Sequence, residues 1–268
     1  MKWPLFLALL ALLAQATTAC GDPTATGENS KGSLVSGTLD SVRTGSTCGD
    51  GELPVGPPFD PAASQPGTLA IAKDDSRIVG FATVVYDVDY GEGVDARWKA
   101  PEKALGPAQG NSVDVTSLGE GGVITLGFDE DLSDKDGPEL CVFENSFSDD
   151  FLELSFVEVA SSNEVFIRFS AVSFTKSPVA DFGTIDPTNI EGFAGKYRQG
   201  YCTPFDLGTL RNREEVASGK VDLSAIRYVR IQDVKGDGGT LDCNGSPIYD
   251  PYPTTQSAGF DLDAIARF

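Results

Sequence analysis

The sequence contains no histidine among its 268 residues, and it has one methionine and two tryptophans. Without imidazole, neither Ser-His-Asp nor Cys-His catalysis is available, and zinc or copper sites that need histidine are excluded. No two cysteines have Cys-x-x-Cys spacing, which disfavours a thiolate metal site or a redox motif. The sequence also lacks an internal repeat.

Basic residues are scarce relative to acidic ones. The chain has 20 Lys and Arg against 40 Asp and Glu, a formal charge of −20. Nucleic acid and anionic lipid surfaces are poor partners for such a charge, so no nucleic-acid partner is expected. Divalent cations are suitable partners, because clustered carboxylates repel one another unless a cation lies among them. A solvated acidic surface that keeps an exported protein soluble explains the same composition, and both interpretations stay open.

Residues 1–19 are typical of a lipoprotein-type signal peptide. Lys2 supplies a positive start, residues 5–13 an apolar run, and small residues precede Cys20, although Thr17 stands where such cleavage boxes usually have Leu. The apolar run is short for a membrane span. We expect lipidation at Cys20 rather than plain secretion, which places the exported protein on a bacterial membrane, at the outer membrane or cell surface, through its acyl chains.

The rest of the chain divides by composition. Residues 20–67 are rich in Gly, Ser, Thr, Pro and Asp and predict a flexible tether. Residues 68–268 contain short β-branched and aromatic runs separated by Gly-rich turns, with almost no helix signal. This pattern predicts a single all-β domain, a β-sandwich or jelly roll with long irregular loops.

The most informative stretch lies near the C-terminus. Two alternating runs, 228–234 and 260–265, predict strands. The 25 residues between them are too rich in Gly, Pro, Asp and Asn for regular structure, and an ordered loop of that length is usually functional. We expect this loop to carry the main site.

Acidic and amide side chains at predicted strand ends indicate a calcium site. The candidate ligands are Glu144, Asn145, Asp233, Asp261 and Asp263. Calcium takes six to eight oxygen ligands, which strand ends and adjacent loops can supply. Asp261 and Asp263 alternate and should share a strand face opposite Phe260 and Leu262. The acidic turn 129–137 also has calcium-like spacing but lacks the remaining features of an EF-hand, and solvation explains these acids equally well.

Aromatic side chains on the predicted loops suggest a platform for a sugar ring or another flat ligand. The candidate ligand-binding residues are Trp98, Tyr197, Tyr201, Tyr249, Asp250 and Tyr252. Packing beneath the loops is the alternative, and aromatic residues serve that purpose more often. Two acid pairs, Glu144 with Asp263 and Glu153 with Glu158, could be drawn as glycosidase pairs. Acids are abundant enough here for such pairs to arise by chance, so the prediction is a protein that is not an enzyme, with a hydrolase as the third alternative.

Several phrases together resemble a family of bacterial exported cell surface proteins, some of which end in a PEP-CTERM sorting tail. They occupy residues 96–106, 118–128, 142–145, 151–159, 194–198, 248–254 and 259–265. The resemblance covers about residues 86–268 and does not include the tail, whose anchoring role lipid on Cys20 would take. The run Gly-Phe-Asp-Leu-Asp-Ala-Ile is also similar to the galactose-binding-like jelly roll, a fold common among carbohydrate-binding modules that often carry structural calcium.

The signal sequence, the acids and the aromatic loops together predict a surface-anchored, calcium-binding lipoprotein that recognises a carbohydrate or another small ligand. The alternatives are a structural or adhesive surface protein, or capture of a corrinoid-type ligand for an outer-membrane transporter.

The cysteines after Cys20 are Cys48, Cys141, Cys202 and Cys243, and an exported protein with four cysteines suggests two disulfides. Cys202 and Cys243 depart from the family's pattern, which implies a Cys202–Cys243 bond and leaves Cys48–Cys141 as the second.

Overall fold

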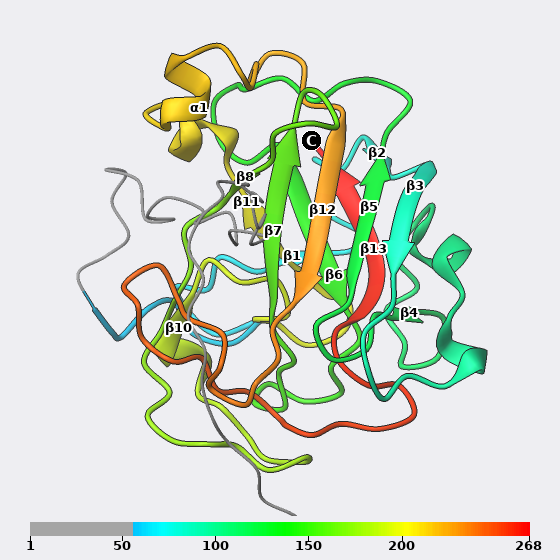
Figure 1. The fold of residues 1–268 in the computed structure, drawn as a ribbon, viewed down its shortest axis with the longest axis vertical. Helices are drawn as coiled ribbons and strands as arrows, with labels where there is room; N and C mark the ends of the chain where they lie inside the picture. The colour runs from blue at the N-terminus through cyan, green and yellow to red at the C-terminus, as the bar shows by residue number, and fades with distance from the viewer. Residues whose placement is uncertain (1–55) are drawn as a thin grey trace, which may run out of the picture. The chain divides into compact units, whose positions relative to one another are not determined.

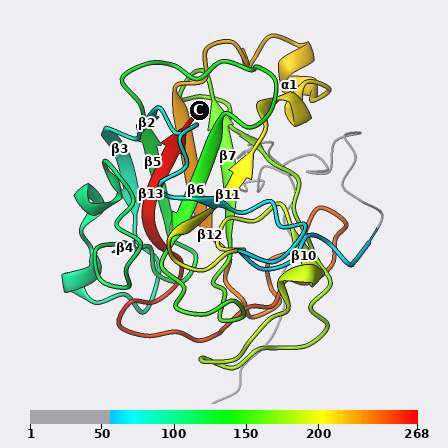
Figure 2. The ribbon, with the colours of Figure 1, turned by 180° about the vertical axis from the view of Figure 1, so that it is seen from behind.

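Two antiparallel β-sheets packed face to face form the centre of the computed structural model, which describes residues 56–268 (Figure 1). Figure 2, seen from behind, shows the sheet that contains β6, β13 and β11 nearest the viewer. The predicted all-β sandwich with long irregular loops is therefore confirmed. No helix of the described residues is long and apolar enough to cross a membrane.

The first sheet has the order β1-β11-β6-β13-β2, with β4 paired to β13. Its strands are β1 (Ile71–Ala72), β11 (Tyr201–Phe205), β6 (Leu140–Glu144), β13 (Asp261–Arg267), β2 (Gly80–Phe81) and β4 (Thr116–Ser117). The second sheet has the order β3-β5-β12-β7-β8. Its strands are β3 (Val84–Asp89), β5 (Val123–Gly127), β12 (Tyr228–Asp233), β7 (Ser155–Ala160) and β8 (Ile167–Arg168).

A separate ladder joins β9 (Val172–Ser173) to β10 (Ile190–Glu191). Helical structure in the described chain is limited to single turns. They are η1 (Ala96–Trp98), η2 (Pro101–Ala104), η3 (Pro187–Asn189), η4 (Leu207–Leu210) and α1 (Glu214–Ala217).

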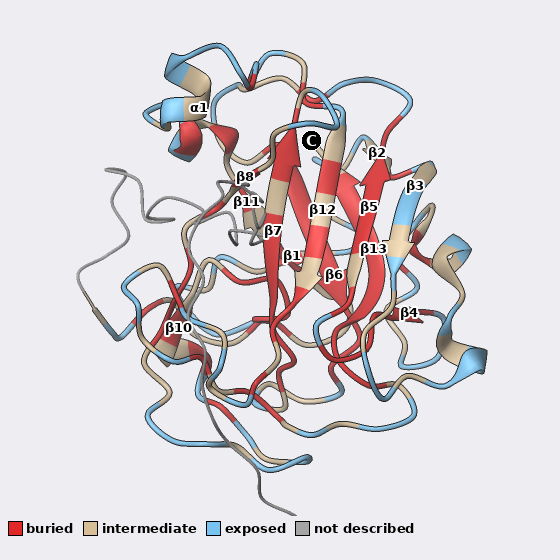
Figure 3. Cartoon of the chain, in the orientation of Figure 1, coloured by how far each residue is buried: buried red, intermediate tan, exposed pale blue. Residues whose placement is uncertain are grey.

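Alternation along the central strands builds the core. In β12, Val229 and Ile231 are fully buried, while the residues that alternate with them, Tyr228, Arg230 and Gln232, are half-buried (Figure 3). Leu140 and Val142 of β6 and Ile265 of β13 belong to the same cluster from the opposite sheet. Burial of each such side chain stabilises the fold by roughly 1.5–3 kcal/mol. The predicted strands 228–234 and 260–265 are thus confirmed, as β12 and β13.

Successive long strands alternate between the two sheets, which is why the loops are long. From β5 through β6, β7, β11 and β12 to β13, every step from one of these strands to the next changes sheet. The connections after β6 and after β12 cross the same end of the sandwich, the lower end in Figure 1. This topology brings loops 145–154 and 234–260 together.

Packing begins earlier in the chain than residue 68, the predicted start of the domain. Phe59 and Ala63 are buried, and the Phe59 ring lies 6.0 Å from that of Phe174. Asp60 forms a salt bridge of 2.5 Å with the fully buried Lys196. The tether prediction therefore fails for residues 56–67, because two apolar anchors suffice to fasten a segment whose average composition is polar.

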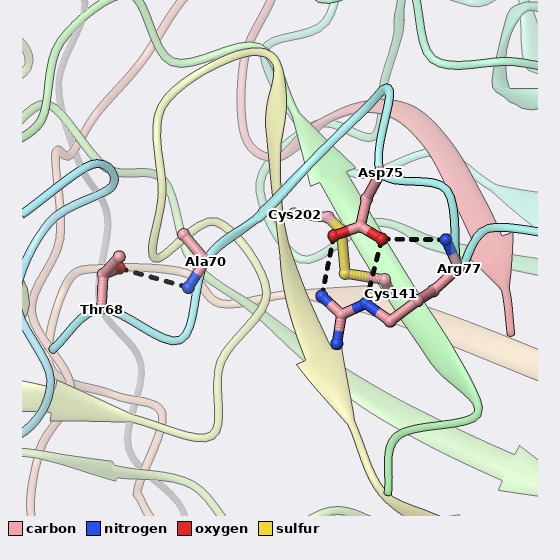
Figure 4. Close-up of a disulfide and its surroundings, with 6 residues drawn as sticks. All are labelled: Thr68, Ala70, Asp75, Arg77, Cys141 and Cys202. Atoms are coloured by element: carbon pink, nitrogen blue, oxygen red, sulfur yellow. Dashed lines mark hydrogen bonds and ion pairs between the residues drawn. A yellow bond between two sulfur atoms is a disulfide. The ribbon is translucent and has the colours of Figure 1, made fainter.

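The disulfide of the first sheet joins Cys141 of β6 to Cys202 of β11, with Cα atoms 5.5 Å apart (Figure 4). The expected Cys202–Cys243 and Cys48–Cys141 bonds are therefore wrong. Cys243 is disulfide-bonded as well, and Cys48 lies outside the described residues. Strand pairing decided the outcome, since β11 and β6 are neighbours and bring these two cysteines within bonding distance.

Peptide mapping without reduction should recover a Cys141–Cys202 linkage. Replacing both residues by Ala should lower the free energy of unfolding by about 4 kcal/mol in the chain-entropy model, because the bond spans 61 residues. Denaturant titration of the double variant measures this loss. A linked peptide pair containing Cys202 and Cys243 would contradict the assignment.

Candidate metal centre

Five buried carboxylates gather where loops 145–154 and 234–260 cross the end of the sandwich. Glu144 ends β6, Glu153 lies two residues before β7, Asp233 ends β12, Asp261 begins β13, and Asp250 lies in the last loop. Each of these side chains belongs to a residue that is 1–5% exposed. We call these five residues the acid cluster.

The members of the acid cluster raise one another's pKa. Burial is the largest cause of the raised pKa of Glu153, followed by the charges of the other four acids. Burial, and then the charge of Asp261, raises the pKa of Glu144 well above its usual value. Burial also raises the pKa of Asp233 and that of Asp261 to about 7. Because no described salt bridge involves any of the five, protons or a bound cation must neutralise them.

Some of these carboxylates also hold the surrounding backbone. The two oxygens of Asp233 accept hydrogen bonds from the amides of Phe260 (2.7 Å) and Gly121 (2.6 Å). Asp250 accepts one from the amide of Leu154 (2.8 Å). Such charge-assisted bonds favour the ionised form of each acid. They also tie the three loops that contain Gly121, Leu154 and Phe260 to the acid cluster.

Two glycines let the backbone approach the acid cluster. A Cβ atom at Gly236 would lie 1.8 Å from Oδ1 of Asp250, and one at Gly195 would lie 1.9 Å from the carbonyl oxygen of Glu153. Neither position has room for any side chain. The backbone at these two glycines therefore packs directly against Asp250 and Glu153.

Some buried oxygen atoms at the acid cluster lack well-aligned hydrogen bonds within the described residues. Oδ2 of Asp261 accepts a bond from Nδ2 of Asn145 (2.9 Å), and the nearby side chains of Ser117 and Ser257 also lower its pKa, but its buried Oδ1 forms no well-aligned hydrogen bond. The neighbouring Ser155 hydroxyl is also buried and unpartnered. Since a buried polar atom without a partner costs about 1–3 kcal/mol, these oxygens are suited to a ligand that supplies positive charge.

The spacing of the acids limits how they could hold an ion. In residues 56–268, three acidic oxygens lie within 4.8 Å of one another only at Asp134, Glu139 and Asp206, outside the acid cluster. An ion in the cluster would therefore need neutral oxygens among its ligands or a movement of a carboxylate toward the others. Glu153 is suited to such a movement, because no hydrogen bond within the described chain restrains its carboxylate.

The second acidic group has one basic partner and several backbone partners. Both oxygens of Asp134 receive hydrogen bonds from Arg211, at 2.5 and 2.8 Å. Glu139 accepts the amide of Leu207 (2.8 Å), and Asp206 accepts that of Gly208 (2.7 Å). One arginine therefore faces three carboxylates, and burial and the charges of Asp206 and Asp134 raise the pKa of Glu139.

Acidic side chains of the turn 129–137 also pair with arginines. This pairing favours a salt-bridged turn over a calcium loop. Asp131 pairs with Arg227 and Glu130 with Arg267, both at 3.0 Å. These side chains are largely exposed, so each pair contributes little to stability.

Asp263 lies close enough for its charge to raise the pKa of Glu144, but its carboxylate is held by another loop and is not counted in the acid cluster. The register of β13 shifts between Leu262 and Ala264, a β-bulge that interrupts the expected alternation. The two oxygens of Asp263 accept the backbone amides of residues 109 and 110, at 2.9 and 2.7 Å. This carboxylate fastens a separate loop and is already satisfied. Of the predicted metal ligands, Glu144, Asn145, Asp233 and Asp261 do lie together.

The predicted aromatic platform is not a single surface. Tyr197 is 2% exposed, and its hydroxyl donates to Asp60, so it is an interior residue. Tyr201 lies near the same segment, with its hydroxyl accepting a bond from Ser64 (2.8 Å) and Arg198 4.6 Å from its ring.

The other predicted aromatic residues lie elsewhere. Trp98 is half-buried beside Arg97, 5.0 Å from its ring, and Lys235 lies 5.5 Å from the ring of Tyr252. Tyr249 is half-buried against Gly238. None of the five rings stacks on another within residues 56–268. Asp250, predicted with them, belongs to the acid cluster.

The sequence missed Glu153 as a member of the site. Alternation between Leu152 and Leu154 would place Glu153 on the polar side of a strand, yet all three residues are buried. Its suggested partner Glu158 lies elsewhere, in salt bridges with Arg168 (2.8 Å) and Arg230 (3.5 Å). The sequence carried one signal for Glu153. Glu144 and Glu153 stand at the two ends of the same loop, between β6 and β7.

Comparison with known proteins finds no family model that matches this chain and no curated protein that matches it.

Without a divalent cation, the protein should become less stable as the pH rises from about 4 to about 7. Asp233 and Asp261 have a pKa of about 7 in the folded chain, against an ordinary value of 3.8 for an exposed aspartate. The folded state therefore holds protons in this window that the unfolded state has lost, and the free energy of unfolding falls with pH.

Melting temperatures measured in chelator across this window test the sign. Asp261→Asn should flatten the decline, whereas Asp131→Asn, which alters a surface salt bridge, should leave it in place. A melting temperature that rises with pH in chelator would contradict the assignment.

Proposed function

We propose that this is an exported, lipid-anchored surface protein whose sandwich binds calcium at the acid cluster and recognises a carbohydrate or another small ligand. The observation that carries the calcium assignment is the set of five buried carboxylates without a basic partner. Calcium prefers carboxylate, amide and backbone oxygens and tolerates irregular geometry, which suits acids contributed by three strand ends and two loops.

The anchoring part of the proposal rests on residues 1–20, which lie outside the described structure. Their pattern of a basic start, an apolar run and small residues before Cys20 supports a lipidated N-terminus. The resemblance to exported cell surface proteins supports the same location.

Calcium would stabilise the loops that cover the end of the sandwich. One ion among the acids replaces mutual repulsion with attraction for every carboxylate it contacts, and it acts on loops 145–154 and 234–260 together. Magnesium demands a tighter octahedral geometry and keeps its waters, so it should substitute poorly.

Calcium should raise the melting temperature of chelated protein, with a stabilisation of about 2.7 kcal/mol at a hundredfold excess over Kd. Glu153→Gln should raise the stability of the chelated protein at neutral pH, because a neutral amide avoids the cost of keeping a buried carboxyl protonated, and should reduce the calcium response. Calorimetry with and without calcium measures both effects.

The matched control is Glu158→Gln, a glutamate of β7 in partly buried salt bridges with two arginines, which should keep the calcium response. The calcium assignment is refuted if chelation changes neither the melting temperature nor the proteolysis of residues 234–259 in the wild-type protein.

Lipidation can be tested independently of calcium. A palmitate analogue supplied during growth should label the wild-type protein and not Cys20→Ser. Equal labelling of the two proteins would contradict the anchor.

A further inference from the structure

Three phenylalanines form a surface stack beside the acid cluster. The rings of Phe147 and Phe151 lie 4.8 Å apart at an angle of 19°, and those of Phe151 and Phe182 lie 6.1 Å apart at 21°. Phe147 is 61% exposed and Phe182 is 77% exposed. We call these three residues the phenylalanine stack.

The stack is assembled from two segments that tertiary structure brings together. Phe147 and Phe151 lie in loop 145–154, whereas Phe182 lies in the turn closed by the bond from the Gly183 amide to the Ala180 carbonyl (2.7 Å). A second backbone bond, from Ile185 to Asp150 (2.8 Å), ties the two segments to each other. The rings are therefore positioned by backbone contacts as well as by their own stacking.

Loop 145–154 is itself restrained at both ends by the acid cluster. Glu144 accepts the amide of Ser146 (2.7 Å) before the two rings, and Asp250 accepts the amide of Leu154 (2.8 Å) after them. Within the loop, the Phe151 amide donates to the hydroxyl of Ser148 (3.0 Å). These bonds hold the first two rings on a short, fastened loop.

We propose that the phenylalanine stack is the ligand-binding surface and that its ligand is a polysaccharide of uncharged sugar rings. This inference rests on the ligand-recognition part of the proposed function and names its location and substrate class. Nearly parallel rings with exposed end members offer flat apolar faces, on which the C–H face of a pyranose can stack.

Charge beside the stack decides between ligand classes. Asp150 and Asp181 lie exposed on the same two segments. Each uses one oxygen in a local bond, to Ser148 and to the Phe182 amide respectively, which leaves the other oxygen to accept from a sugar hydroxyl. These acids repel phosphates, uronic acids and anionic lipid headgroups. A bilayer is disfavoured for a second reason, since inserting the rings would bring these carboxylates toward hydrocarbon.

Affinity electrophoresis of the full chain carrying Cys20→Ser, in calcium buffer, tests the proposal. The gels would contain galactomannan, mannan or a β-glucan as neutral probes, with alginate as the anionic comparison. At least one neutral polysaccharide should retard the protein and alginate should not. Phe147→Ala and Phe182→Ala should each weaken retardation about tenfold, the size expected when a stacking ring is lost.

Two matched variants separate recognition from folding. Phe182→Trp keeps a flat ring and should retain binding, whereas Val79→Ala trims another exposed apolar residue, 64% exposed, and should change nothing. Melting temperatures of all variants show whether each protein is folded.

Each remaining outcome overturns the proposal in a distinguishable way. If the wild type binds a neutral polysaccharide and both Ala variants bind it equally well, recognition stands and the stack is the wrong surface. If no neutral probe retards the protein, or if it instead floats with phosphatidylcholine vesicles, the polysaccharide assignment fails. The calcium-dependent melting temperature of the same protein tells whether the metal part of the proposed function fails with it.

Discussion

The loops of this protein depend on buried carboxylates that accept backbone amide hydrogens. Asp233 joins two loops, Asp250 fastens loop 145–154, and Asp263 holds residues 109 and 110. Glu120 accepts the amide of Thr254 in the last loop in the same way (2.8 Å). Long connections without helix or strand have few backbone partners of their own, and buried amides must be paired. Here the acids supply that pairing.

This solution creates an electrostatic problem at the centre of the acid cluster. Glu144, Asp233 and Asp250 accept backbone amides, but burial opposes the ionisation of all five acids, and neighbouring acids add to this opposition in every one except Asp261. Protons relieve the repulsion at low pH, whereas a divalent cation can relieve it at higher pH while the oxygens remain acceptors.

The same arrangement links the interior to the surface. Loop 145–154 is anchored by Glu144 and Asp250 and displays Phe147 and Phe151 outside. Whatever neutralises the acids therefore acts on the segment that positions the phenylalanine stack. The disulfide between β6 and β11 stiffens the first sheet, whose strand β6 leads directly into this loop.

The sequence by itself determined the all-β class, the two closing strands and the importance of the acids near them. Those features are local: alternation reports the two faces of one strand, and composition reports charge. Tertiary structure alone decided that Glu153 is buried with the cluster, that a bulge assigns Asp263 to another loop, and that Cys141 bonds Cys202. It also decided that Phe182 completes a stack with Phe147 and Phe151, rather than the tyrosines forming one platform. Each of these depends on which distant segments pair across sheets and loops, and a period-two pattern carries no information about that pairing.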